Sequence, residues 1–110
     1  MNFSFKLKGK KITIPVRECR SLFSQMQGLM FSEKTDVLLF IFKKKTRQPI
    51  HSFFCKKFVA IWFRDKEIVD VRAVNPWRFS VKPKQLFDTL LEIPVGNQLY
   101  NKILDGMRKI

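Results

Sequence analysis

The chain of 110 residues carries 22 Lys and Arg against 9 Asp and Glu, a formal net charge of +13, and 45% of its residues are hydrophobic. This length and composition are typical of one globular domain that needs neither a disulfide nor a metal to fold, and they exclude a disordered chain. No apolar run reaches the roughly 18 residues of a membrane-spanning helix, since the longest covers only residues 37–42.

The N-terminal segment, residues 1–11, alternates apolar and polar residues and lacks the order of charges followed by an apolar stretch that marks a secretory signal. We therefore expect a soluble cytoplasmic protein. Cys19 and Cys55 lie far apart and form no C-x-x-C motif, so neither a redox motif nor a zinc knuckle is indicated. In a reducing compartment we expect two buried thiols.

Period-two alternation predicts strands at residues 3–7 and 12–16, joined by a turn. Pro15 has no N–H to donate, which places the second strand at a sheet edge. Apolar residues spaced three and four apart then predict a short amphipathic helix near residues 18–27, and Gly28 suits its C-terminal cap.

The middle of the chain predicts four more strands, and a tight turn at Asp65 and Lys66 joins the last two. The first of them is apolar on both faces, which predicts that it is covered on both sides. The basic segment at 43–49 reads as a surface loop. The four strands are residues 37–42, 50–55, 58–63 and 67–74.

Residues 75–84 form a predicted loop broken by Pro76 and Pro83. Residues 85–94 fit a helix or a strand, and we prefer a strand for the second half. A helical turn follows near residues 97–103. Together these elements predict an α+β fold that is mostly β, with an antiparallel, barrel-like sheet of about six or seven strands and one or two short helices.

Four motifs occur in a fixed order: G-L-M-F at 28–31, L-L-F-I-F at 38–42, H-S-F-F-C at 51–55 and L-L-E-I-P-V-G at 90–96. In this order they resemble a small prokaryotic family known as domain of unknown function 192, over about residues 16–110. The resemblance implies a compact, β-rich α+β fold and no established activity.

The chain departs from that family's pattern in its strand motif. The Pro and Asp of the family strand correspond to Phe58 and Ala60, its usual Met corresponds to Cys55, and the Asp after the late glycine corresponds to Met107. If the family Asp served a shared site, this chain would lack it.

Catalysis and metal binding have little support in the residues. His51 and Cys55 face the same side of a predicted strand, but four strand residues separate them by about 13 Å, beyond hydrogen-bond reach. Whether Cys19 approaches His51 depends on the fold. One His and two distant Cys are too few for a metal centre, and no phosphate-binding or dinucleotide motif occurs. We expect no catalytic residue, no metal and no cofactor, although an enzyme assembled from dispersed residues stays open.

The function we predict first is a binding module for a small ligand or peptide. Its groove would lie where residues 28–31, 51–55 and 77–79 converge, because a few polar groups in an apolar pocket are typical of ligand sites. The candidate contacts are His51, Met30, Trp77 and Arg78. The alternative for these side chains is plain core packing.

The second function we predict is binding of a polyanion, RNA or single-stranded DNA. Residues 75–84 interleave Trp77 and Phe79 with cations, and aromatic rings stack on bases while cations hold phosphates. The alternative is that the charge is only surface composition. Oligomeric state and any other partner are unknown from the residues. The candidate contacts are Lys43, Lys44, Lys45, Arg47, Lys82 and Lys84.

Overall fold

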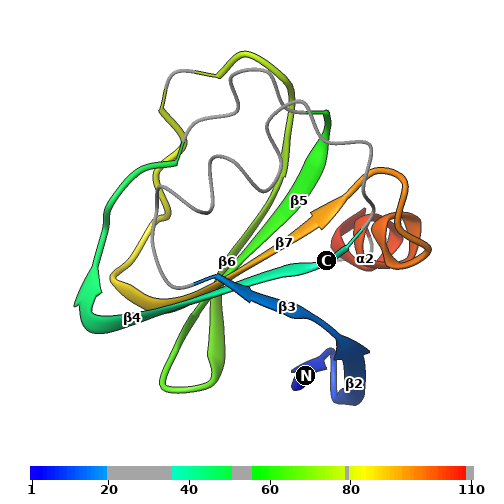
Figure 1. The fold of residues 1–110 in the computed structure, drawn as a ribbon, viewed down its shortest axis with the longest axis horizontal. Coiled ribbons are helices and arrows are strands. Elements are labelled where there is room, and N and C mark those ends of the chain that lie inside the picture. The colour runs from blue at the N-terminus through cyan, green and yellow to red at the C-terminus, as the bar shows by residue number, and fades with distance from the viewer. Residues whose placement is uncertain (20–35, 51–55, 79, 109–110) are drawn as a thin grey trace.

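The computed structural model describes residues 1–19, 36–50, 56–78 and 80–108 (Figure 1). Within them, no helix has the length and hydrophobicity needed to cross a bilayer. The described elements are β1 (Asn2–Leu7), β2 (Lys10–Pro15), β3 (Arg17–Cys19), β4 (Leu38–Thr46), β5 (Phe58–Arg64), β6 (Glu67–Val74), β7 (Phe87–Pro94) and α2 (Leu99–Arg108).

The strands form two sheets. β1 and β2 are an antiparallel hairpin, and the other five strands form a sheet in the order β3-β4-β7-β5-β6. This confirms the mostly β fold with a helix, but the predicted single barrel-like sheet is wrong: the five-stranded sheet stays open at β3 and β6 in the described chain. The predicted antiparallel pairing also fails at β3–β4, which is parallel. The long connection between β3 and β4 allows that pairing, which a short turn could not.

The five-stranded sheet is apolar on both faces because β5 lies at its interior and is buried from Phe58 to Phe63. On one face, Val59, Ile61 and their neighbours pack against the β1–β2 hairpin and α2. On the other face, Phe58 and Trp62 pack with Phe87 and Leu90 of β7. Figure 1 shows the hairpin below the sheet at the lower right and α2 at its right. Two-sided cover of this kind follows from strands with no polar face.

The predicted surface loop at 43–49 is wrong for residues 43–46, because β4 continues to Thr46, and it is confirmed for residues 47–49, which are exposed and lie outside any strand. Ile41 pairs with Thr89 and Thr46 pairs with Phe87, so residues 42–45 form a wide bulge opposite Asp88. β3 ends opposite Phe40, and beyond that point no other strand of the described residues pairs with this side of β4. Lysines are well tolerated at such an edge, where they discourage pairing with other chains.

The other predicted elements have mixed outcomes. The β5–β6 hairpin is confirmed, and so is the strand in the second half of 85–94, although it begins earlier, at Phe87. Of the predicted helix 18–27, residues 18 and 19 belong to β3 and the rest lies outside the described residues. Ile50 forms a single bridge with Val81, and the remainder of the strand predicted at 50–55 also lies outside.

The helical turn predicted at 97–103 is confirmed and extends to Arg108. Asn97 accepts a hydrogen bond from the backbone N–H of Leu99 at 2.9 Å, which satisfies a donor at the start of the helix. The apolar stripe through Tyr100 and Ile103 is buried against the sheet. Because Gly106 has no Cβ, the helix comes close to Leu7: a Cβ there would lie 3.3 Å from the Leu7 Cδ2 atom.

The turn between β5 and β6 has positive φ at both Asp65 (50°) and Lys66 (71°), the mark of a type I′ hairpin. Gly is preferred at the second position of such a turn, because the Cβ of any other residue is sterically strained in the left-handed conformation. Lys66 therefore costs stability at this position. We expect Lys66→Gly to raise the free energy of unfolding by about 0.5–1 kcal/mol, measured by urea denaturation. Glu67→Gly, one residue into β6, is the matched control and should lower it. A destabilised Lys66→Gly would contradict this account of the turn.

Candidate nucleic-acid interface

The predicted small-ligand contacts are not brought together by the described chain. His51 and Met30 lie outside the described residues. Trp77 and Arg78 follow β6 in the loop before β7, and both are exposed, Trp77 by 57%. Trp77 also has a positive φ of 64°, which turns the chain sharply at that point. The predicted groove therefore stays a prediction, and its proposed contact Trp77 points to solvent rather than into the core.

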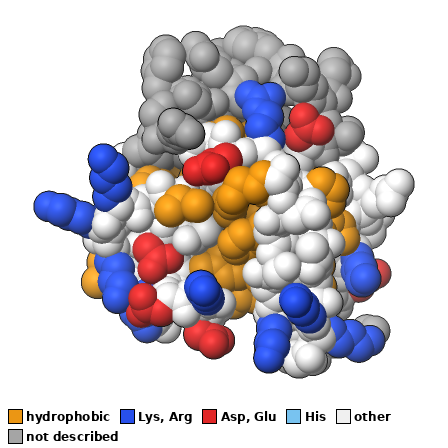
Figure 2. All heavy atoms as spheres, turned by 60° about the horizontal axis from the view of Figure 1, so that its bottom comes forward, with side chains coloured by type: hydrophobic (Ala, Val, Ile, Leu, Met, Phe, Trp, Pro, Cys, Tyr) orange, Lys and Arg blue, Asp and Glu red, His pale blue; other side chains and the backbone are white. Residues whose placement is uncertain are grey.

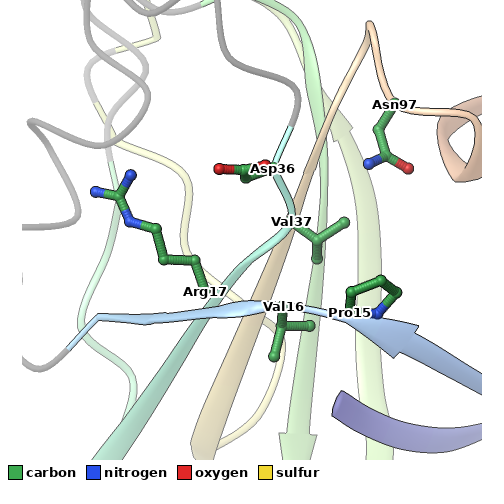
Figure 3. Close-up of a pocket in the computed structure, with 6 residues that line it drawn as sticks. All are labelled: Pro15, Val16, Arg17, Asp36, Val37 and Asn97. Carbon is green, nitrogen blue, oxygen red and sulfur yellow. The ribbon is translucent and has the colours of Figure 1, made fainter. Parts of the chain in front are cut away.

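One described pocket lies where β2 and β3 meet the start of β4 and the turn before α2 (Figure 3). Its volume is about 280 Å³, and none of the predicted site residues lines it. Figure 3 shows Arg17 and Asn97 on opposite sides of Val37. The charges of Arg17 and Asp36 have opposite sign, so this pocket offers an anion no net attraction.

The two segments that carry the predicted nucleic-acid contacts, in contrast, meet through the side chain of Arg47. Arg47 Nε and an Arg47 terminal nitrogen donate to the carbonyl oxygen of Pro83, at 3.3 and 3.1 Å. Because Lys82 and Lys84 flank Pro83, the link sets the basic end of β4 beside them. Sequence separation alone, 36 residues between Arg47 and Pro83, gave no sign of this contact.

A buried carboxylate fixes the same loop from the other side. Asp70 on β6 is 8% exposed and accepts hydrogen bonds from the backbone N–H groups of Val71 and Lys84, at 2.9 and 3.0 Å. Arg72 Nε lies 3.3 Å from Asp70 Oδ2 and balances its charge. Backbone bonds to an ionised group are among the stronger ones. The Lys84 backbone is therefore held in place while its ammonium group is left to solvent.

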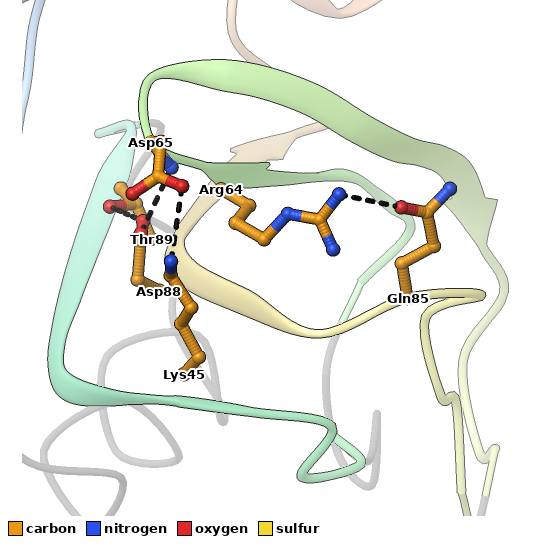
Figure 4. A network of polar contacts seen from close by, with 6 residues as sticks. All are labelled: Lys45, Arg64, Asp65, Gln85, Asp88 and Thr89. Atoms are coloured by element: carbon orange, nitrogen blue, oxygen red, sulfur yellow. Dashed lines mark hydrogen bonds and ion pairs between the residues drawn. The ribbon is translucent and has the colours of Figure 1, made fainter.

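The lysines of the β4 bulge differ in how far they are neutralised. Lys45 Nζ lies 3.1 Å from Asp65 Oδ2, but the two side chains are 48% and 70% exposed, and such a surface pair contributes little. Figure 4 shows this pair beside Asp88, which accepts a hydrogen bond from the Asp65 backbone N–H at 3.0 Å. Among the described residues, Lys43 and Lys44 form no ion pair, and neither do Lys82 and Lys84.

Arg64 adds a cation that is not among the predicted contacts. One of its terminal nitrogens donates to Gln85 Oε1 at 3.1 Å, next to Lys84 (Figure 4). On a further face, Figure 2 shows Lys and Arg side chains around a strip of hydrophobic side chains, with Asp and Glu among them. Positive charge is therefore spread over the molecule. The basic end of β4 and the 82–85 loop differ from the rest of the basic surface because the hydrogen bonds from Arg47 to Pro83 hold them together.

Two buried ionisable groups lie on the sheet face that carries Trp62, and they are Cys19, whose predicted burial is confirmed, and Glu92, which was not among the predicted site residues. Glu92 of β7 is 3% exposed and pairs with Leu38 and Ala60 on its neighbouring strands. Cys19 is 5% exposed, and its thiol lies 4.0 Å from the carbonyl oxygen of Arg17. The indole N–H of Trp62 is buried without a hydrogen-bond partner. A charge inside the apolar run at 90–94 was the available signal for Glu92.

Within the described residues, no group of three or more His, Cys, Asp or Glu side chains could hold a metal ion. The expectations of no metal and no cofactor rest on the residue types and stay expectations. Phe79, which was to stack on bases beside Trp77, lies outside the described residues.

Comparisons with known proteins give relatives without a stated activity. No family model matches the chain. It is 36% identical over 93 residues to a UPF0127 protein of Pyrococcus furiosus, covering 81% of this chain and 79% of the relative. A UPF0127 protein of Thermococcus sibiricus is 36% identical over 96 residues, with 83% and 62% covered. A third, of Pyrococcus abyssi, is 38% identical over 83 residues, with 72% and 70% covered.

Two solved structures share the fold. One is a protein of unknown function from Novosphingobium aromaticivorans, with a TM-score of 0.75 and 15% identity, covering 86% of this chain and 73% of that one. The other is a candidate transcription regulator from Sinorhizobium meliloti, with a TM-score of 0.74 and 16% identity, covering 93% and 82%. At these identities the likeness concerns the fold alone.

Burial raises the pKa of the Cys19 thiol, Arg17 opposes the shift, and the nearby Glu92 adds to it. At pH 8 the thiolate fraction of Cys19 should therefore lie below that of a free cysteine, whose pKa is about 8.5. In a Cys55→Ser variant, we expect Cys19 to react slowly with a thiol reagent at pH 8 and faster as the pH rises further. The same variant unfolded in guanidinium should react at the rate of free cysteine. Equal rates in the native and unfolded protein would contradict this placement of Cys19.

Proposed function

This chain belongs to the uncharacterised UPF0127 family, and from its described surface we propose that it binds single-stranded nucleic acid, RNA in the first place, through residues 43–47 and 82–84. The observation that carries the proposal is the double hydrogen bond from Arg47 to the carbonyl oxygen of Pro83. It joins two basic segments that are distant in sequence into one surface. The phosphate backbone of a nucleic acid presents closely spaced negative charges to such a surface.

The charge of this surface is available to a ligand. Lys43, Lys44, Lys82 and Lys84 are exposed and form no ion pair among the described residues. Lys45 has only an exposed pair with Asp65, which a phosphate could replace at little cost. Each phosphate contact releases condensed counterions, so binding through these ammonium groups gains entropy and depends on salt.

An aromatic ring favours a single strand over a duplex. Trp77 is 57% exposed in the same loop that carries Lys82 and Lys84. Stacking of a base on such a ring contributes about 1–3 kcal/mol, and only unpaired bases present their faces to it. Sequence preference should be weak, because ammonium groups and a stacking ring read no base edges.

Three further predictions remain proposals, and they concern the small-ligand groove, the family designation and the cellular location. A small-ligand or peptide groove at His51 and Met30 has no support from the described residues, since neither is among them. The designation as domain of unknown function 192 rests on the ordered motifs, because the relatives carry the name UPF0127. A cytoplasmic location would agree with binding RNA.

The salt dependence of binding tests the proposal. We expect a fluorescein-labelled oligouridylate of about 20 nucleotides to raise its anisotropy on binding, with affinity falling steeply between about 50 and 200 mM salt. The double variant K43Q/K44Q should reduce the slope of log K against log salt by about 1.4, since each phosphate contact on a single strand contributes about 0.7. Its affinity at about 0.1 M salt should drop by roughly tenfold or more.

The matched control is K11Q/K102Q, which removes the same charge from the β1–β2 hairpin and α2, away from Arg47. It should leave the slope nearly unchanged. Equal losses in both double variants would show a nonspecific charge effect and end the proposal, and so would the absence of any anisotropy change at low salt. A Trp77→Ala variant should lower affinity for the single strand and not for a blunt duplex of the same length.

A further inference from the structure

A second basic region surrounds a groove between the β1–β2 hairpin and α2, apart from the surface proposed above. Its volume is about 480 Å³, within the usual range of small-ligand sites. The residues that line it are Leu7, Lys8, Lys10, Lys11, Ile12, Lys102, Asp105 and Gly106. The hairpin and the helix that form its walls both pack on the same face of the large sheet.

The fold brings the two walls together closely. Gly106 is the point where α2 approaches the hairpin, since a Cβ on it would lie 3.3 Å from the Leu7 Cδ2 atom. Leu7 and Ile12 are partly buried hydrophobic residues that pack on the core below. The base of the groove is thus tied to the core.

The charges around the groove are strongly unbalanced. Four lysines line it against one carboxylate, Asp105. Among the described residues, these lysines form no ion pair with Asp105 or with any other carboxylate. Like charges gathered at a concave surface focus the field and attract an anion.

The apolar base defines the rest of the ligand. Leu7 and Ile12 are aliphatic, and none of the described residues that line the groove is aromatic, so they offer a nucleobase no stacking partner. An aliphatic chain, in contrast, gains free energy by covering Leu7 and Ile12 in proportion to the apolar area removed from water. Ammonium groups serve as point charges for a phosphate or a carboxylate.

The turn that carries one of the lysines is strained. Lys8 has a φ of 51° and Gly9 a φ of 80°, which define a type I′ turn whose first position favours Asn or Gly. Lys8 adopts the left-handed backbone conformation, in which its Cβ crowds the backbone and the conformation is strained. Strain retained in this way often marks a position where the side chain has a use.

We propose that the groove between the β1–β2 hairpin and α2 binds a small organic anion with an aliphatic chain, its phosphate or carboxylate held by Lys8, Lys11 and Lys102 and its chain lying on Leu7 and Ile12. This site is independent of the nucleic-acid surface.

Octyl phosphate is the probe that tests the site, with inorganic phosphate and octyl glucoside as its two halves. In nitrogen-15 NMR titrations, octyl phosphate should shift the amide resonances of Leu7, Ile12 and Gly106 in a saturable manner. Inorganic phosphate should bind more weakly, and octyl glucoside should cause no saturable shift. Equal binding of octyl glucoside would overturn the proposal, and so would a failure of octyl phosphate to shift these resonances.

Two variants separate loss of the site from loss of the fold. K11Q/K102Q should lower the affinity for octyl phosphate by about tenfold, because it removes two of the four ammonium groups. K43Q/K44Q should bind octyl phosphate with the affinity of the unaltered chain. Lys8→Asn should raise the Tm, because Asn relaxes the turn, and should still lower the affinity for octyl phosphate. Loss of affinity in a more stable protein could not be explained by unfolding. Unchanged binding by K11Q/K102Q would overturn the proposal. If oligouridylate binding fails while these results hold, only the nucleic-acid proposal falls.

Lipid vesicles distinguish the source of the anion. Octyl phosphate is a free molecule that can enter the groove with its chain, whereas a bilayer presents phosphates with their chains already buried. Retention of the protein on phosphatidylglycerol vesicles, without shifts by octyl phosphate, would assign the lysines to a membrane surface and overturn the small-molecule site.

Discussion

The burial of β5 on both faces is the constraint on which the rest of the structure depends. From Phe58 to Phe63 this strand offers no polar face to water, and it pairs with β7 on one side and β6 on the other. Both faces of the sheet must therefore be covered by other parts of the chain. The β1–β2 hairpin and α2 cover one face, and this is the reason that they lie side by side with a groove between them.

Much of this architecture could be predicted from local patterns, because alternation and turn chemistry act over a few residues. The β1–β2 hairpin, the Asp65–Lys66 turn and a helical turn near residues 97–103 were all evident in the sequence, whereas the full length of α2 was not. Residues 43–46 read as part of a loop because they are polar, yet they continue β4 on a side where no other described strand pairs with it beyond Phe40. The number of strands fits a closed barrel and an open sheet equally well, because it does not reveal whether the first and last strands of a sheet pair. The predicted barrel could therefore not be distinguished from the open sheet.

The candidate sites were less predictable, because each depends on contacts between distant segments. The charge excess pointed to anions, and the six lysine and arginine candidates were chosen from it. Only the fold shows that Arg47 joins Pro83, or that Lys102 faces the same groove as Lys8 and Lys11. The placement of Glu92 inside the sheet likewise follows from its pairing between Leu38 and Ala60, neither of which is near it in the sequence.

The strand order has a consequence for how the chain reaches this structure during synthesis. β7 lies between β4 and β5 in the sheet, yet it leaves the ribosome after both of them. Until it arrives, β4 and β5 each have an unpaired backbone edge next to exposed apolar side chains, a combination that promotes association between nascent chains. β7 is the strand that joins β4 to β5 and completes the sheet. A polypeptide that ends before Phe87 would therefore need protection by a chaperone.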